Sequence, residues 1–215
     1  MKTDNNTRTG KEAPYLTLEE GKLLVGLARQ AITAHLENKT LEMPQTTQRL
    51  KEKSGVFVTL NRDHPRELRG CIGFPYPDSP LRDATVRAAI YAATEDPRFD
   101  PISLEEFQRN TVVEVTVLTP PQTLHFEDRK KLPELITVGK HGLIIEGHGT
   151  SGLLLPQVAV EWNWDSTDFL SNCCLKAGLP PDYWLLEGTT VKVFEGEIFG
   201  EIKPRGEIRR KTDGE

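Results

Sequence analysis

Leu68-Arg69-Gly70-Cys71-Ile72-Gly73 is the stretch that decides the fold, and it carries two glycines and one of the chain's three cysteines. Read as a β-strand, it alternates between two faces, so Arg69, Cys71 and Gly73 share one of them. Glycine inside a strand usually marks a bulge or a place where another backbone or a ligand comes close. We therefore predict one apolar face and one face with a guanidinium beside a thiol, and we count Gly70 and Gly73 among the candidate ligand-binding positions.

The sequence on both sides of this strand predicts a β-hairpin followed by a helix. Residues 55–60 are rich in β-branched and aromatic residues, and residues 61–67 contain the turn-forming Asp63-His64-Pro65. Ser79 and Pro80 suit the N-cap and first position of a helix that we expect to reach about residue 94. The hairpin therefore returns through a longish loop before the chain turns into the helix.

The rest of the chain predicts further helices and strands. Thr17 and Glu20 form a capping box for a first helix that fades near residue 38, and a second capping box begins a short helix at Ser103. The remaining expectations are a loop over 39–54, strands over 111–118, 142–146, 153–156 and 190–198, a glycine-rich turn over 147–152, and helices over 130–136 and 165–178.

Both halves of the chain show the order hairpin, helix, connector, strand. This weak repeat predicts an α+β fold with a duplicated unit of antiparallel hairpin, helix and strand. We expect two lobes, each with helices packed on a mixed or antiparallel sheet. In this interpretation residues 1–13 are a disordered tail, residues 14–202 are one domain of two interlocked lobes, and residues 203–215 are a charged tail.

The composition is ordinary for a globular protein, with 37% hydrophobic and 27% charged residues. No apolar run reaches the ~18 residues that a membrane helix needs, and the first dozen residues lack the apolar core of a signal peptide. We therefore predict a cytoplasmic protein that does not bind membranes. The net charge of −5 speaks against nucleic-acid binding, because that function needs a basic surface.

The cysteines and histidines predict neither a disulfide framework nor a metal site. Two of the three cysteines, Cys173 and Cys174, are adjacent, which fits a reducing compartment. The closest histidine pair, His141 and His148, is surrounded by glycines that suggest a hairpin, and no C-x-x-C or H-E-x-x-H motif occurs.

Several short motifs, taken in order, match one known family. They are LRGCIG at 68–73, Ala92 with DPRF at 96–99, EVTVLT at 114–119, GKHG at 139–142, LPQVA at 155–159, WD at 164–165, FL at 169–170 and KAGL at 176–179. They span about residues 55 to 185, most of the chain. The chain thus resembles the AMMECR-one domain family, in its stand-alone form.

The resemblance implies a two-lobed α+β fold built from a duplicated unit, with the hexapeptide 68–73 near the cleft between the lobes. It implies no established activity and no known cofactor. Members of the family are often encoded beside, or fused with, Memo-type proteins and a radical-SAM protein, so these are the expected partners. Human members have been discussed in connection with RNA metabolism and gene regulation.

Cys71 is the sharpest catalytic candidate. A thiolate next to Arg69 would have a lowered pKa, because a nearby cation favours the charged form. A cysteine nucleophile also needs a base, and His141 could supply it from the second half of the chain. The alternative is that Cys71 is a small buried residue, because free cysteine is among the most buried residue types.

The charged candidates have two interpretations each. Arg69 either binds an anionic group of a substrate or forms a structural ion pair with Asp96, Asp165 or Glu114, since burying an unpaired charge is costly. Asp96 and Arg98 either satisfy backbone groups at the turn after a helix or form one wall of the cleft.

Trp164 and Gln157 are the remaining candidates for substrate binding. Trp162 and Trp164 share one face if residues 160–165 are extended, and they either pack in the core or form a stacking platform for a ring. Gln157 either hydrogen-bonds a ligand or a neighbouring loop.

The sequence supports two competing functions. The first is a small-molecule enzyme, or the substrate-handling partner of one, that uses the face of Arg69 and Cys71. The second is a non-catalytic regulatory module that binds protein or RNA, with Cys71 in a structural role. An accessible, acidic Cys71 thiol would favour the first, and a packed thiol the second.

Overall fold

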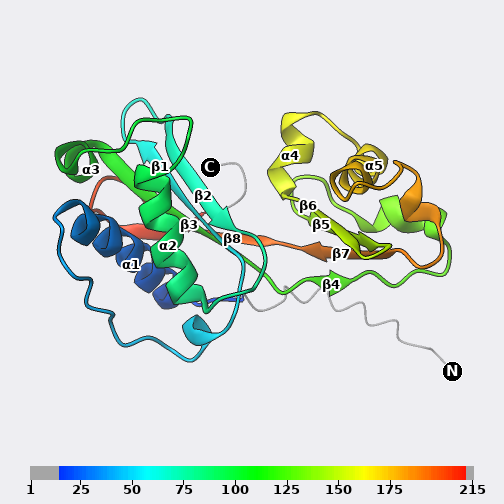
Figure 1. Ribbon diagram of the computed structural model, residues 1–215, viewed down its shortest axis with the longest axis horizontal. Coiled ribbons are helices and arrows are strands. Elements are labelled where there is room, and N and C mark those ends of the chain that lie inside the picture. The colour runs from blue at the N-terminus through cyan, green and yellow to red at the C-terminus, as the bar shows by residue number, and fades with distance from the viewer. Residues whose placement is uncertain (1–14, 212–215) are drawn as a thin grey trace, which may run out of the picture.

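Two antiparallel β-sheets divide the chain into two lobes that lie side by side (Figure 1). The structure is a computed structural model, and it describes residues 15–211. The tail predicted over residues 1–13 lies outside these residues. Helices pack on the sheets, so the predicted α+β class is confirmed. Within the described part of the chain, no helix is both long and apolar enough to cross a membrane.

The first lobe is built on a five-stranded sheet with the strand order β2-β1-β3-β8-β9. Its strands are β1 (Val56–Arg62), β2 (Leu68–Phe74), β3 (Thr111–Leu118), β8 (Gly196–Glu201) and β9 (Ile208–Lys211); its helices are α1 (Leu18–Leu36), α2 (Leu81–Thr94), α3 (Leu104–Asn110) and the short 3-10 helix η1 (Arg49–Lys51). α1 contacts β3, β8 and β9, while α2 contacts β1 and β2. Both long helices therefore cover the same face of the sheet.

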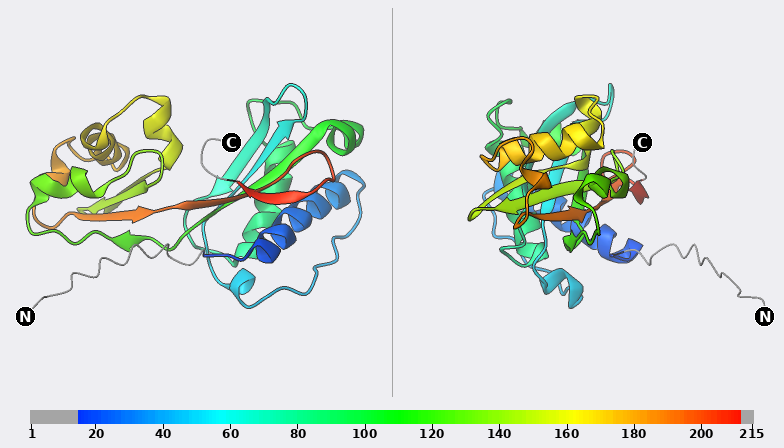
Figure 2. Two further views of the ribbon diagram at one scale, coloured as in Figure 1. Left: turned by 180° about the vertical axis from the view of Figure 1, so that it is seen from behind. Right: turned by 90° about the vertical axis from the view of Figure 1, so that its right-hand side faces the viewer.

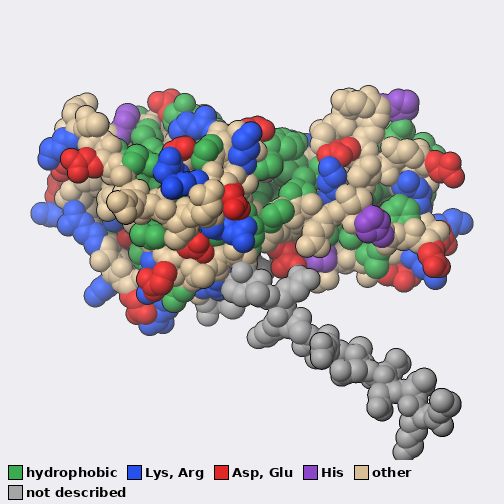
Figure 3. All heavy atoms as spheres, turned by 90° about the horizontal axis from the view of Figure 1, so that it is seen from below, with side chains coloured by type: hydrophobic (Ala, Val, Ile, Leu, Met, Phe, Trp, Pro, Cys, Tyr) green, Lys and Arg blue, Asp and Glu red, His purple; other side chains and the backbone are tan. Residues whose placement is uncertain are grey.

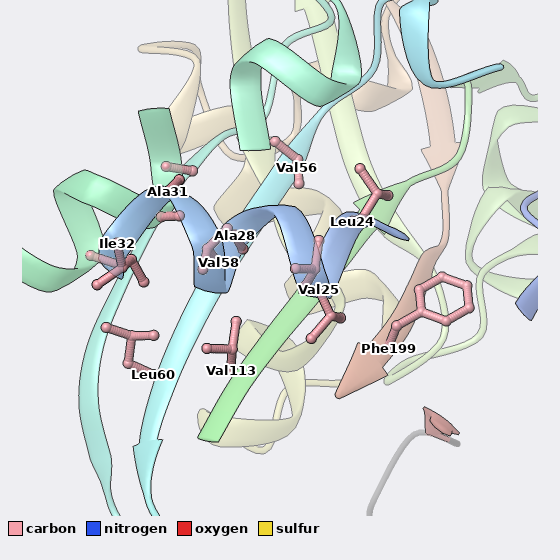
Figure 4. Close-up of a cluster of buried hydrophobic side chains, with 14 of the residues drawn as sticks. Leu24, Val25, Ala28, Ala31, Ile32, Val56, Val58, Leu60, Val113 and Phe199 are labelled. Atoms are coloured by element: carbon pink, nitrogen blue, oxygen red, sulfur yellow. The ribbon is translucent and has the colours of Figure 1, made fainter. Parts of the chain in front are cut away.

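Side-chain alternation in the strands decides which face the helices cover. Val56, Val58 and Leu60 of β1 are fully buried on the face that the helices cover, in the same apolar cluster as Leu24 and Ala28 of α1 (Figure 4). The residues between them in β1 must point to the other face, because successive strand side chains alternate. α1 itself begins at the predicted capping box, which is formed in both directions between Thr17 and Glu20.

The second lobe is built on a four-stranded sheet with the strand order β4-β7-β5-β6. Its strands are β4 (Gln122–Thr123), β5 (Gly142–Gly147), β6 (Thr150–Leu154) and β7 (Thr190–Phe194); its helices are α4 (Pro156–Glu161), α5 (Ser166–Lys176) and the 3-10 helices η2 (Arg129–Leu135) and η3 (Tyr183–Leu185). A separate apolar cluster, which includes Phe169, Leu170 and Trp184, forms the core of this lobe.

The two lobes repeat one arrangement of strands. The hairpin β1-β2 is followed by helices and by β3, which pairs with β1; the hairpin β5-β6 is followed by helices and by β7, which pairs with β5. Each hairpin also has a glycine where a helix presses on its second strand. A Cβ on Gly70 would lie 2.1 Å from Ala92 O, and one on Gly152 would lie 2.6 Å from Cys173 O. The duplicated unit predicted from the element order is therefore present.

Within residues 15–211 the chain crosses between the lobes twice, and the two crossings lie side by side. β3 leads into β4 of the second lobe, and β7 leads back into β8 of the first (Figure 2). The Thr119 N–H donates to Glu195 O (2.8 Å), and the Glu195 N–H donates to Thr119 Oγ1 (2.8 Å). The single strand predicted over 190–198 is thus wrong: it is two strands, in two sheets, on either side of Glu195.

Two further segments differ from the sequence prediction. Pro156 does not end a strand; it stands at the start of helix α4, so residues 160–165 are not extended as supposed. Proline fits the first helical turn because its missing N–H would be unpaired there anyway. Residues 208–211, predicted as part of a charged tail, form β9 and pair with β8. The first lobe therefore extends beyond the predicted boundary at residue 202.

Candidate functional site

A cavity of about 740 Å³ lies between the two lobes. Its floor is the face of the five-stranded sheet opposite α1 and α2, and its roof comes from α4 and the loop before β5. Figure 3 shows hydrophobic side chains gathered where the lobes meet. We call this cavity the interlobe cleft.

The floor of the cleft consists of rows of side chains that strand register places next to one another. Cys71 pairs with Thr59, and Thr59 pairs with Glu114, so these three lie in one row across β2, β1 and β3. Phe57 and Thr116 are partners in the next row, which Ile198 of β8 continues. The first row is polar, while the second row is mainly apolar.

The side chain of Lys211 reaches the polar row from β9, at the far edge of the sheet. Its Nζ forms an ion pair with Glu114 Oε2, and the two side chains are only 13% and 18% exposed. A Cβ on Gly200 of the intervening β8 would lie 2.9 Å from Lys211 Cε. The Lys211 side chain can cross β8 because the residue beneath it is a glycine.

The second lobe supplies the roof. Leu155, Pro156, Gln157 and Val160 come from the start and outer face of α4, and residues 138–140 come from the loop before β5. Within residues 15–211, no three His, Cys, Asp or Glu side chains are grouped closely enough to hold a metal ion. The groups facing the cleft are therefore the Glu114–Lys211 ion pair, hydroxyls, a thiol and an amide among apolar side chains, with the more exposed Lys140 and Glu161 on the roof.

Cys71 lines the cleft, but its thiol is not activated. The Thr59 hydroxyl donates to Cys71 Sγ (3.2 Å). Burial raises the pKa of the thiol, against the opposing effects of the Thr59 hydrogen bond and the Arg98 charge. A neutral thiol at physiological pH follows, in contrast to the lowered pKa that the sequence suggested.

Arg69 does not lie beside Cys71 in the cleft. Leu60 pairs with Gly70 and Asn61 pairs with Leu68, so a β-bulge leaves Arg69 without an opposite residue on β1. Its guanidinium binds Glu106 of α3, with Nε–Oε1 and Nη2–Oε2 distances of 2.7 and 3.2 Å. Arg69 is 7% exposed, so this is a buried structural ion pair, with a partner that is none of the three predicted.

Asp96 and Arg98 protect the free edge of β2. The Cys71 N–H donates to Asp96 Oδ2 (2.8 Å), and Arg98 Nη2 donates to Cys71 O (3.4 Å). Arg98 Nε and Nη2 also donate to the Asp96 carboxylate, at 2.9 and 2.7 Å. These hydrogen bonds hold the pKa of Asp96 well below its usual range, and the largest effect comes from the Arg98 side chain. The pair thus satisfies backbone groups of the edge strand and does not line the cleft.

The two glycines of the hexapeptide make room for protein groups. Gly70 admits the carbonyl of Ala92 in α2, on the helix side of the sheet. A Cβ on Gly73 would lie 2.1 Å from Phe57 Cδ1. Gly73 therefore lets the Phe57 ring lie across β2, where the ring becomes part of the cleft floor.

His141 and Trp164 lie outside the cleft lining, whereas Gln157 belongs to it. The Thr137 N–H donates to His141 Nδ1 (3.1 Å), while His141 Nε2 is 3.8 Å from Glu195 Oε1. Burial is the main cause that lowers the pKa of His141. Among the described residues, Cys71 Sγ has only Thr59 as a hydrogen-bond partner. The structure therefore does not join Cys71 and His141 into a nucleophile–base pair.

The two tryptophans stack on each other, with ring centroids 6.0 Å apart and an interplanar angle of 19°. Trp164 packs on the core of the second lobe, whereas Trp162 is 68% exposed. Trp162 follows α4 as its C-cap, so both rings are placed by the helix end and not by an extended strand.

Sequence reasoning missed the ion pair of Glu114 and Lys211 in the cleft. The alternation in residues 111–118 already placed Glu114 and Thr116 on the face opposite Val113, Val115 and Val117, which is a usable signal for β3. No comparable signal pointed to Lys211, because its segment carries four charges within residues 207–211 and reads as a tail.

Comparisons with known proteins identify the relatives of this chain. The AMMECR1 family model matches residues 25–199. Protein MK0488 of Methanopyrus kandleri is 52% identical over 197 residues, covering 91% of this chain and 95% of that protein. Protein PH0010 of Pyrococcus horikoshii is 54% identical over 198 residues, covering 90% and 95%. The crystal structure of uncharacterized protein PH0010 superposes with a TM-score of 0.74 at 53% identity, covering 92% of this chain and 99% of that one.

Proposed function

The chain belongs to the AMMECR1 family, and from this premise we propose that its interlobe cleft binds a small organic molecule. The protein is then either an enzyme that acts on that molecule or a protein that holds the molecule for an enzyme. The observation that carries the proposal is the inward-facing set of polar groups, Glu114, Lys211, Thr116 and Gln157, in a largely apolar cavity.

The size and lining of the cleft support a small ligand. Its volume of about 740 Å³ falls within the ~300–1,000 Å³ typical of sites for small molecules. Such sites combine apolar walls with a few polar groups that orient the ligand. Here Phe57 and Ile198 supply apolar floor and Leu155 and Val160 apolar roof. A ligand with an apolar body and one polar end fits this distribution.

The chemistry proposed for the cleft is centred on Glu114 and Lys211 and not on a cysteine nucleophile. Cys71 has a raised pKa, and a thiol is a weak nucleophile compared with its thiolate. A carboxylate can act as a general base and an ammonium as a general acid once a ligand group separates them. Reaction chemistry at this site would therefore be acid–base work at the Glu114 end.

Retention of a small molecule by the purified protein tests the proposal. Native mass spectrometry after incubation with a deproteinised cell extract should show a bound molecule that dialysis removes slowly. Thr116→Trp places a large ring in the cleft and should abolish retention. Thr40→Trp introduces the same ring at an exposed position away from the cleft and should retain the molecule. Equal retention by both variants would contradict the proposal.

A second candidate function is docking of a partner protein at the mouth of the cleft. The observation in its favour is that Val160 and Trp162 are 58% and 68% exposed beside the roof. Exposed apolar side chains at a rim are typical of interaction sites. Memo-type and radical-SAM proteins are the partners implied by the family. Size-exclusion chromatography of this chain with such a protein should show a complex that Trp162→Ser weakens and Leu175→Ser, at another exposed apolar residue, leaves intact.

A further inference from the structure

The polar end of the interlobe cleft carries two opposite charges at one point. Glu114 and Lys211 are both largely buried, and they pair with each other. The nearest row neighbours, Thr59 and Cys71, are uncharged at neutral pH. The pair therefore contributes no net charge to the place where a ligand would meet it.

The pair also leaves hydrogen-bonding capacity unused. Among the described residues, Glu114 Oε2 is the only partner of Lys211 Nζ, and Glu114 Oε1 has none. An ammonium offers three donors, and a carboxylate accepts at both oxygens. At least one donor and one acceptor are thus available, side by side, at the polar end of the cleft.

We infer, building on the proposed function, that the Glu114–Lys211 pair is the recognition element of the cleft and selects an uncharged ligand group with a hydrogen-bond donor beside an acceptor. A lactam or primary amide has this character. Its N–H donates to the Glu114 carboxylate while its carbonyl accepts from Lys211. A lone anion would meet repulsion from Glu114, and a lone cation would meet repulsion from Lys211. The arginine that could have bound an anion, Arg69, is committed to Glu106.

Lys211 is a recognition residue that lies beyond the part of the chain matched by the family model, which ends at residue 199. Its position depends on Gly200, because a side chain at residue 200 would occupy the space of Lys211 Cε. Gly200→Ala therefore displaces the ammonium without removing its charge. The neighbour that must move is the far end of a flexible side chain, so the fold tolerates the change.

Three probes with one ring system test the inference at pH 7: 2-quinolone as a neutral lactam, quinoline-2-carboxylate as an anion, and quinolin-2-ylmethanamine as a cation. Titration calorimetry or ligand-observed NMR gives their dissociation constants. We expect the lactam to bind the unmodified protein roughly tenfold more tightly than either ion, the scale of a hydrogen bond to a charged group.

Two charge variants should change this order in opposite directions. Glu114→Gln leaves Lys211 unpaired, so the carboxylate probe should gain affinity roughly tenfold; Lys211→Met leaves Glu114 unpaired, so the amine probe should gain similarly. Gly200→Ala should weaken the lactam. Gly26→Ala in α1, where a Cβ would meet nothing within 4 Å, is the matched glycine control and should change no constant.

The outcomes separate this inference from the proposed function. An order of affinities that stays the same in both charge variants overturns the inference, as does failure of the lactam to bind more tightly than the ions. The retention test with Thr116→Trp judges small-molecule binding by itself. Retention without any response to the charge of Glu114 or Lys211 would leave the cleft as a ligand site and refute the recognition role of the pair.

Discussion

At the scale of single residues, Cys71 shows how burial and neighbours decide the chemistry of a side chain. Its strand presents it to the cleft, but burial raises the pKa of the thiol. The thiolate fraction at pH 7 must then be lower than the few per cent of a free thiol, whose pKa is about 8.5. We predict slow alkylation of native Cys71 by iodoacetamide, with an apparent pKa above that of a free thiol, measured site by site with mass spectrometry.

The other two cysteines provide the internal control for this measurement. Burial raises the pKa of Cys173 to about 12, and Cys174 is also buried, so both should react only after unfolding. Rapid modification of Cys71 below pH 8, with Cys173 and Cys174 still protected, would refute the neutral thiol and restore the nucleophile hypothesis.

Asp96 is the residue whose charge most clearly supports the fold. Its pKa is lower in the folded protein than the ~3.9 expected when the chain is unfolded. The stabilisation is therefore present above about pH 4 and is lost as pH falls toward the folded value. We predict that Asp96→Asn lowers the free energy of unfolding by about 2 kcal/mol at pH 7, the scale of hydrogen bonds to a charged group. The deficit should shrink at pH 3, as measured by urea unfolding.

An exposed carboxylate in the same turn gives the matched control. Asp100 is exposed, and Asp100→Asn should leave the unfolding free energy nearly unchanged at both pH values. A deficit for Asp96→Asn that is equal at pH 7 and pH 3 would show that the charge of Asp96 is not what stabilises the edge of β2.

At the scale of elements, the close contacts of two glycines test whether the lobes are equivalent units. An added Cβ would lie 2.1 Å from Ala92 O at Gly70, and 2.4 Å from Ala177 N at Gly152. The obstructing atoms are helix backbone, which cannot move without shifting α2 or α5. We predict that Gly70→Ala and Gly152→Ala each cost about 3 kcal/mol, the upper range for overpacking, as measured by chemical denaturation. Gly26→Ala should be neutral or stabilising, and a neutral Gly70→Ala would mean that α2 does not press on β2.

The elements also show what could be predicted from the sequence. The capping box at Thr17 and the alternation of residues 111–118 are local signals, and both describe the structure correctly. The partner of Arg69 was missed because a bulge changes which way a side chain points, and alternation does not reveal a bulge. Pro156 was misread because proline both ends strands and begins helices.

The polar end of the cleft could be predicted only in part. Glu114 faces away from Val113, Val115 and Val117, so a local pattern indicates its side of the sheet. The position of Lys211 depends on the pairing of β9 with β8 and on the absence of a side chain at Gly200. These are long-range contacts, and nothing in residues 207–211 alone distinguishes a paired strand from a charged tail.

At the scale of the whole molecule, the second lobe is a continuous segment inserted between two paired strands. Its four strands all lie within residues 122–194, and its core draws on residues 132–193. The core of the first lobe draws on residues before 118 and on Phe199. The main apolar contact between the lobes is one small cluster around Leu118, Ile144 and Phe194. Each lobe therefore has a core that does not depend on the other.

We predict that the first lobe folds without the second. Leu118 pairs with Gly196, and Thr119 is hydrogen-bonded to Glu195, so replacing residues 120–194 by Asn-Gly should close β3 and β8 into a hairpin. Circular dichroism and urea unfolding should show one cooperative transition, and the protein should retain no small molecule because the roof is gone.

Removing Glu195 as well shifts β8 by one residue and turns Phe199 away from α1, so this control should not fold cooperatively. Failure of the first excision to fold would mean that the interlobe cluster around Leu118, Ile144 and Phe194 is required for the stability of the first lobe.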